Sequence, residues 1–188
     1  MAFEKWRRAG GTVSECLFYF SAARSGTSIV LPRNFLSRVR CVLQPGDSLL
    51  LGTDLEKSHS QLIRAYDDEL GVTAAFNLNL LARINRELGA DFNLAEFQHV
   101  ARINEEARSV EMHLLSKRRQ VVSVPAAEVV VEFREGETIW TESSHKYSID
   151  EICETARKAG FRCDVQWVDE EWPFAENLLV AEWLQPSR

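Results

Sequence analysis

The first part of the chain contains short apolar runs typical of strands and a stretch with apolar residues at helical spacing. Residues 16–20 (CLFYF) form a short apolar run that predicts a buried strand. Residues 33–42 carry apolar positions at helical spacing and predict a helix. After the turn residues Pro45 and Gly46, the run SLLLGTD at 48–54 predicts a strand buried on both faces, as in a parallel α/β sheet.

The middle of the chain favours helices first and strands afterwards. Apolar residues recur at helical spacing across 55–67 and 72–88. Asn93 is a typical N-cap, and we expect it to begin a further helix that contains Phe97. Beyond residue 108 the period changes to two, which predicts a series of strands joined by tight turns: SVEMHLLS, QVVSV, AEVVVEF and ETIWTES.

The last part of the chain returns to a mixed pattern. Ser148 and Glu151 form an S-x-x-E capping box, which predicts the start of a helix. The runs FRCDVQWV and ENLLVAEWL then predict two strands, antiparallel to each other and in one sheet with the early strands. We therefore expect an α/β fold in which a lobe, residues 56–146, is inserted into a sheet built from residues 1–55 and 147–188.

Composition and charge narrow the range of partners. The net charge of −6 argues against nucleic acid and against an acidic membrane surface as partners. No apolar run approaches the roughly 20 residues that span a bilayer. The start MAFEKWRRAGG lacks the apolar segment of a secretory signal. We expect a cytoplasmic monomer with no membrane or nucleic-acid partner.

The cysteines and histidines show no pattern typical of a metal site. The four cysteines are scattered, without a CxxC pair, so we expect free thiols and neither a zinc site nor a disulfide framework. The four histidines are not spaced as ligands, and we expect them on the surface or packed within the lobe. We expect Asp67 and Asp68 to brace a helix end.

An ordered series of motifs is more specific than these periodicities. LQPGDSLLLGTD is followed by AYDDELGVTAAFNLNLLARINRELGADFNLAEFQHVARIN, by VEMHLLS and by GETIWTESSHKY. This series, from about Phe35 to the C-terminus, resembles the family of histidine-specific, SAM-dependent methyltransferases. The resemblance implies a partial class I (Rossmann-like) methyltransferase sheet with an inserted α+β substrate-binding lobe. It also implies SAM as methyl donor and histidine as substrate, whose α-amine receives three methyl groups to give hercynine, the precursor of ergothioneine.

The resemblance also implies which residues hold the substrate. Tyr66, in AYDD, matches a tyrosine that holds the amine and carboxylate end, and is the candidate catalytic residue. Glu142 and Ser144, in TESS, match a pair that recognises the imidazole, and strand alternation places both on one face. Met112, in VEMHL, matches a methionine that lines the imidazole pocket, with plain core packing as the alternative. Thr73 is a candidate for a further polar contact, with capping of a helix start as the alternative.

Two departures from the family bear on activity. The family's glycine-rich SAM loop and its ribose-binding acid lie further upstream of the position matching Tyr66 than this chain extends. We therefore expect no SAM binding by this chain and assign no cofactor-binding residue. In the stretch SAARSGTS, where the family has a GS(S/T)IGNF-like segment, Gly26 replaces a substrate-binding asparagine. A shift of reading frame over residues 1–32 would explain that mismatch.

Three interpretations of function follow. The first is a histidine Nα-methyltransferase. The second is a catalytically inactive fragment or amino-acid-binding remnant, which we favour for the activity of the chain by itself. The third is a piece of a fused ergothioneine enzyme that also performs sulfoxidation, for which no motif after the match gives support. The upstream coding DNA would discriminate among them best.

Overall fold

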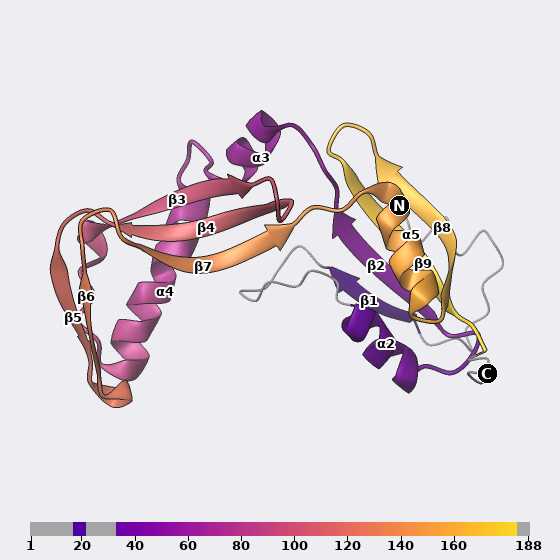
Figure 1. Cartoon of the computed structure of the whole chain (residues 1–188), viewed down its shortest axis with the longest axis horizontal. Helices are drawn as coiled ribbons and strands as arrows, with labels where there is room; N and C mark the ends of the chain where they lie inside the picture. The colour runs from indigo at the N-terminus through magenta and orange to yellow at the C-terminus, as the bar shows by residue number, and fades with distance from the viewer. Residues whose placement is uncertain (1–16, 22–32, 184–188) are drawn as a thin grey trace. The chain divides into compact units, whose positions relative to one another are not determined.

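The computed structural model describes the backbone of residues 17–21 and 33–183, and side chains from Phe35 onward. These residues divide into two compact units (Figure 1). The sheet unit holds residues 17–21, 33–56 and 145–183, and the lobe unit holds residues 57–144.

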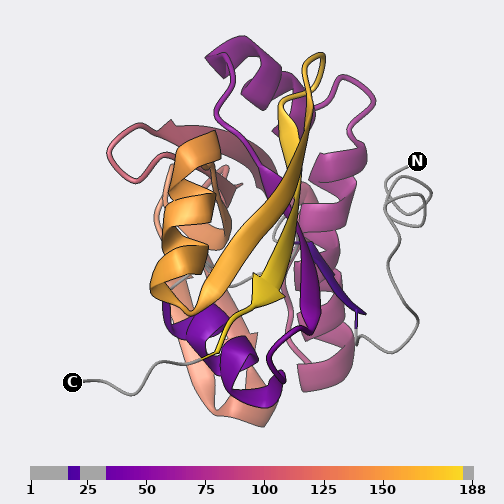
Figure 2. The same cartoon turned by 90° about the vertical axis from the view of Figure 1, so that its right-hand side faces the viewer.

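The sheet unit is a four-stranded sheet with two helices. Its strands lie in the order β1 (Leu17–Ser21), β2 (Ser48–Asp54), β9 (Phe174–Ala181) and β8 (Phe161–Asp169). β1 is parallel to β2, and β9 is antiparallel to both β2 and β8. Two helices, α2 (Arg33–Val42) and α5 (Ile149–Lys158), lie beside the strands (Figure 2). The α/β class and the antiparallel pairing of the last two strands are confirmed.

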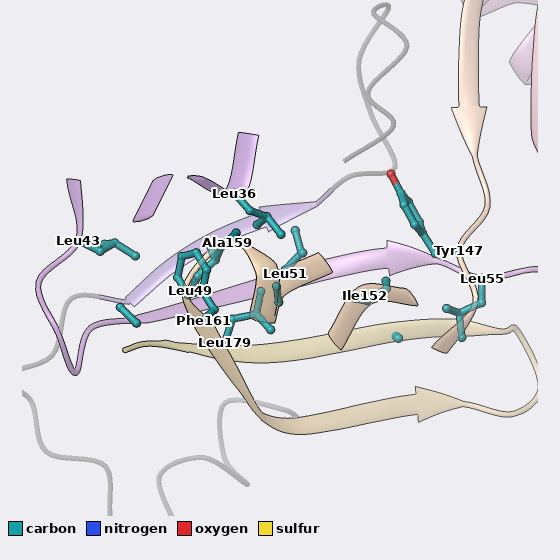
Figure 3. Close-up of a cluster of buried hydrophobic side chains, with 13 residues drawn as sticks. Leu36, Leu43, Leu49, Leu51, Leu55, Tyr147, Ile152, Ala159, Phe161 and Leu179 are labelled. Carbon is teal, nitrogen blue, oxygen red and sulfur yellow. The ribbon is translucent and has the colours of Figure 1, made fainter. Parts of the chain in front are cut away.

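The core of the sheet unit lies between these helices and the strands (Figure 3). Leu36 of α2 and Ile152 of α5 belong to one cluster with Leu51 of β2, Phe161 of β8 and Leu179 of β9. Each of these side chains is at most 1% exposed. Full burial of such a side chain contributes about 1.5–3 kcal/mol to the free energy of unfolding. The apolar residues at helical spacing in α2 and α5 therefore form the face of each helix that packs against the sheet.

Between residues 33 and 183, the chain leaves and re-enters the sheet unit at one place, the end of β2. Leu55 and Tyr147 form a parallel β-bridge there. The Tyr147 N–H donates to the Asp54 carbonyl at 3.0 Å, and the Glu56 N–H donates to the Tyr147 carbonyl at 3.0 Å. Lys146 Nζ donates to Asp54 Oδ2 at 2.6 Å, and the two side chains are only 3% and 15% exposed. Main-chain bonds and a buried ion pair thus hold the two crossings together.

The lobe unit contains two helices, a three-stranded sheet and a two-stranded ribbon (Figure 1). The helices are α3 (His59–Tyr66) and α4 (Val72–Leu88), and a 3-10 turn, η1 (Leu94–Glu96), follows them. The sheet has the order β3 (Phe97–Asn104), β4 (Ser109–Ser116) and β7 (Thr138–His145). The ribbon pairs β5 (Gln120–Val124) with β6 (Val129–Phe133) through a second 3-10 turn, η2 (Pro125–Ala127).

Aromatic side chains dominate the core of the lobe unit. The rings of Phe97 and Phe133 meet edge to face with their centroids 5.5 Å apart, and the ring of Phe92 lies 5.7 Å from that of Phe97. Leu81 of α4 and Leu114 of β4, both fully buried, belong to the same cluster. The cluster joins α4 to the strands, so the lobe unit has a hydrophobic core of its own.

The helix expected after Asn93 does not form, and that prediction was wrong. Asn93 Oδ1 accepts the Ala95 N–H at 3.2 Å, but it caps only the single turn η1. Phe97 then begins strand β3, which pairs with β4 along its whole length. Phe97 and His99, two positions apart, are 2% and 5% exposed, so the burial follows a strand period. Pairing with β4 therefore outweighs the local helix signal.

Three further properties concern the part of the chain that the structure describes. None of its helices is both long enough and apolar enough to cross a membrane. No cluster of three or more histidine, cysteine, aspartate or glutamate side chains in this part could hold a metal ion. The described cysteines are free thiols: Cys41, Cys153 and Cys163.

Candidate functional site

One hydrogen bond in the lobe unit joins two of the candidate residues directly. Tyr66 is the last residue of α3, and Ser144 lies near the end of β7, 78 positions later. The Tyr66 hydroxyl donates to Ser144 Oγ at 2.7 Å, and Ser144 is 6% exposed. A serine hydroxyl that accepts one hydrogen bond can also donate one. The fold thus brings together two residues that lie far apart in the sequence.

Helix α3 is positioned by bonds at both of its ends. At its start, Ser58 Oγ accepts the Gln61 N–H at 3.3 Å, and Gln61 Oε1 accepts the Ser58 N–H at 3.3 Å. At its end, the last carbonyls of a helix have no partner within the helix. The carbonyl of Tyr66 is such a group, and His99 Nε2 lies 2.7 Å from it. The backbone that carries the Tyr66 ring is therefore held by a side chain of β3.

Met112 and Glu142 lie on neighbouring strands of the lobe sheet. Thr141 Oγ1 donates to the Met112 carbonyl at 2.9 Å, which ties β7 to β4 at this point. The Met112 side chain is buried, and Glu142 is half-buried. Trp140 Nε1 donates to the Glu142 carbonyl at 3.0 Å. Since side chains alternate along a strand, Glu142 and Ser144 share one face of β7.

Thr73 lies in the first turn of α4, where its N–H and its hydroxyl bond to the Asp68 carboxylate. Asp68 Oδ1 accepts the Thr73 N–H at 2.8 Å, and Asp68 Oδ2 accepts the Val72 N–H at 3.0 Å. The Thr73 hydroxyl, followed by these backbone bonds, lowers the pKa of Asp68 to about 2. Asp68 therefore caps α4, as the sequence predicted for a helix end, and Thr73 takes part in the capping that was its alternative role.

A group of buried polar side chains that bonds to the backbone of Tyr66 was not predicted from the sequence. Asn77 of α4 and His99 of β3 are 4% and 5% exposed. Asn77 Nδ2 lies 2.9 Å from His99 Nδ1 and 3.3 Å from the His113 carbonyl. Asn77 could have been found as the polar residue one helical turn before the buried Leu81. His99 could have been found only by recognising the strand period of β3.

A pair of hydrogen-bonded side chains lies on β4, on either side of Met112 in the sequence. His113 Nε2 lies 3.2 Å from Glu111 Oε2, and Asn104 Nδ2 donates to Glu111 Oε1 at 2.9 Å. The bond from Asn104, followed by the interaction with His113, holds the pKa of Glu111 below its ordinary value. The His113 ring stacks on Trp140 with 6.3 Å between centroids. An ionised carboxylate is therefore held on β4, on the face opposite to the Met112 side chain.

The chain is similar to a known family and to three curated proteins. Residues 29–181 match the family model described as histidine-specific methyltransferase, SAM-dependent. Histidine N-alpha-methyltransferase of Mycolicibacterium smegmatis is 44% identical over 169 residues, which cover 89% of this chain and 53% of that protein. The protein of the same name from Mycobacterium tuberculosis is 45% identical over 163 residues, covering 86% and 51%. N-methyltransferase fsqC of Aspergillus fumigatus is 28% identical over 147 residues, covering 78% and 39%.

The chain spans about half the length of the mycobacterial relatives that it matches. Among solved structures, a SAM-dependent methyltransferase from Clostridium acetobutylicum has a TM-score of 0.43 and 10% identity, covering 96% of this chain and 70% of that one. A likeness of that size carries no argument about function. The family model, in contrast, matches most of the chain, and both mycobacterial relatives share more than two fifths of the aligned residues. The chain therefore belongs to the family of histidine-specific, SAM-dependent methyltransferases.

Proposed function

We propose that this chain carries the histidine-binding lobe of a histidine Nα-methyltransferase. That enzyme transfers methyl groups from SAM to the α-amine of L-histidine and gives hercynine for ergothioneine synthesis. The observation that carries the proposal is the 2.7 Å bond between Tyr66 and Ser144, which joins two motifs of the family series. The names of the two mycobacterial relatives support the same substrate and the same acceptor atom.

The imidazole is assigned to Glu142, Ser144 and Met112. A neutral imidazole has one N–H donor and one acceptor nitrogen. The Glu142 carboxylate accepts from the ring N–H, and the Ser144 hydroxyl donates to the other nitrogen. The thioether of Met112 fits against the ring. An amino acid with an apolar ring would leave the Glu142 carboxylate without a substrate donor, so this arrangement selects histidine.

The amine of the substrate is assigned to Tyr66. Tyr66 gives its only hydroxyl proton to Ser144, so its oxygen can only accept from the substrate. An amine N–H is a donor and a carboxylate is not, and we therefore place the amine at the Tyr66 oxygen. By holding one N–H of the neutral amine in the first two transfers, Tyr66 directs the nitrogen lone pair, and an oriented nucleophile reacts faster. SAM supplies the electrophilic methyl group when it is bound, and we assign none of the described side chains to it.

Calorimetric titration of L-histidine into the chain tests the binding part of the proposal. Saturable binding is expected, and Glu142→Ala should weaken it by about 10- to 150-fold, because a charge-assisted hydrogen bond is lost. Glu132→Ala, which removes an exposed carboxylate of the same lobe, is the matched control and should leave the affinity unchanged. Equal affinity in wild type and Glu142→Ala would remove Glu142 from the site. A folded chain that binds no histidine would favour the inactive remnant.

Methyl transfer is tested with the protein expressed from the complete gene. Incubation with SAM and L-histidine should give histidine that carries three added methyl groups, detected by mass spectrometry. Tyr66→Phe should lower kcat, because the amine loses its acceptor. Methylation on a ring nitrogen, or a Tyr66→Phe variant with the kcat of the wild type, would contradict the assignment.

A further inference from the structure

Asn77 and His99 form the strongest feature of the lobe unit that the proposed function does not use. Both side chains are buried, 4% and 5% exposed, at the contact between α4 and β3. Buried polar side chains are costly unless their hydrogen bonds are made. Here the bonds lead to the backbone of Tyr66, the residue assigned to the substrate amine.

The direction of each bond follows from the groups at the two ends. The His113 carbonyl can only accept, so the Asn77 atom 3.3 Å from it is the amide nitrogen. The same nitrogen lies 2.9 Å from His99 Nδ1, which must therefore accept the second amide proton. The Tyr66 carbonyl also can only accept, so His99 Nε2, at 2.7 Å, carries the ring proton. His99 is thus the neutral imidazole protonated on Nε2.

We infer that Asn77 and His99 are positioning residues for Tyr66. Asn77 fixes the tautomer of His99, and His99 then supplies the donor that the final carbonyl of α3 requires. Fixing this carbonyl fixes the backbone from which the Tyr66 ring projects, and so the contact of its hydroxyl with Ser144. The effect on histidine binding rests on the proposed function, whereas the placement of the Tyr66 ring does not.

Nuclear magnetic resonance of the chain tests the placement without any ligand. The ¹⁵N signals of His99 should be those of the neutral form protonated on Nε2. His99→Phe keeps a ring but removes the donor, and should shift the ring signals of Tyr66. His99→Gln keeps an N–H that can reach the Tyr66 carbonyl, and should return these signals toward their wild-type positions. The opposite tautomer, or unchanged Tyr66 signals in His99→Phe, would overturn the inference.

Histidine affinity tests whether the pair acts through Tyr66. His99→Phe should weaken L-histidine binding by about 2- to 10-fold, the effect of one neutral hydrogen bond, and His99→Gln should restore most of it. In a Tyr66→Phe background, His99→Phe should cause no further loss, because the hydroxyl that it positions is already gone. Fully additive losses would overturn the inference. If the folded wild-type chain binds no histidine, the proposed function fails, and the resonance comparison alone decides the role of the pair.

Discussion

The sheet unit and the lobe unit both bury hydrogen-bonded polar side chains, but the bonds lead to different groups. In the sheet unit, the fully buried Asn177 of β9 bonds to main-chain and side-chain groups of β2 and β8, at distances of 2.7 to 3.1 Å. In the lobe unit, the buried Asn77 bonds to His99, and His99 bonds to the main-chain carbonyl of Tyr66, whose hydroxyl donates to Ser144. The first set of bonds joins neighbouring strands, and the second set ends at residues that we assign to the substrate.

This difference separates stability from recognition. A buried polar side chain whose bonds only join strands of the sheet contributes to the free energy of unfolding and to little else. A buried polar side chain whose bonds lead to a residue assigned to the substrate contributes to both unfolding and ligand affinity. The same chemical substitution should therefore have one consequence in the sheet unit and two in the lobe unit.

The largest loss is expected from the buried ion pair of the sheet unit. Lys146→Met leaves the Asp54 carboxylate, 15% exposed, without its ammonium partner. Removing one member of a buried pair costs about 3–5 kcal/mol of unfolding free energy, measured by urea denaturation. Lys158→Met, at the exposed pair with Glu154, is the control and should change little. If Asp54→Leu combined with Lys146→Met does not recover most of the loss, the ion pair is not its cause.

Core truncations should cost both units a similar amount. Leu179→Ala in the sheet unit and Leu81→Ala in the lobe unit each remove a fully buried side chain. Each should lower the unfolding free energy by about 2–5 kcal/mol, because a cavity replaces packed atoms. Hydrogen exchange should show that each variant loses protection mainly in its own unit. Equal loss of protection in both units after either change would mean that they unfold as one.

A matched pair of asparagine substitutions tests the comparison most directly. Asn177→Leu and Asn77→Leu each leave buried groups without a bond, which costs about 1–3 kcal/mol of stability. Only Asn77→Leu should also weaken L-histidine binding, measured by calorimetry at a temperature where both variants are folded. Weaker binding in Asn177→Leu would show that the division between the units does not hold.

The smallest effect concerns the start of α4. The bonds from Thr73 and Val72 lower the pKa of Asp68 from 3.8 to about 2. Because this pKa is lowered in the folded state, the ionised form stabilises the fold above about pH 4, and this contribution is lost as the pH falls toward 2. Thr73→Ala should raise the pKa of Asp68, followed by carboxyl resonance, and leave histidine affinity unchanged. A loss of affinity would give Thr73 a role in substrate binding.

Local sequence patterns predicted the helices and strands whose signal lies within a short stretch of the chain. The capping box at Ser148 and Glu151 forms as expected, because its bonds lie within one turn. The strands after residue 108 were also predicted, because apolar residues recur in them with a period of two. β3 was missed, because the N-cap signal of Asn93 precedes it and Arg102 blurs its alternation. Its identity is decided by pairing with β4, which local sequence does not specify.

The candidate site depends on distant contacts even more strongly. No period places Tyr66 against Ser144, and only the resemblance to a family nominated these two residues. Asn77 and His99 were not nominated, because their bond requires α4 to lie on β3. Nothing in the sequence distinguishes this asparagine and this histidine from others of their kind. Their role follows from the groups that they bond to in the fold.

The paired crossings at Leu55 and Tyr147 have a consequence for how this architecture can change. Bonds of 3.0 Å hold the departing and returning segments side by side, so any segment inserted between them has its ends already joined. The entropy cost of closing a loop rises only slowly with its length. The sheet unit can therefore accept a longer, shorter or different lobe without being rebuilt. Under the proposed function, exchange of residues 57–144 as a cassette would give a common scaffold a new amino-acid preference in a single genetic event.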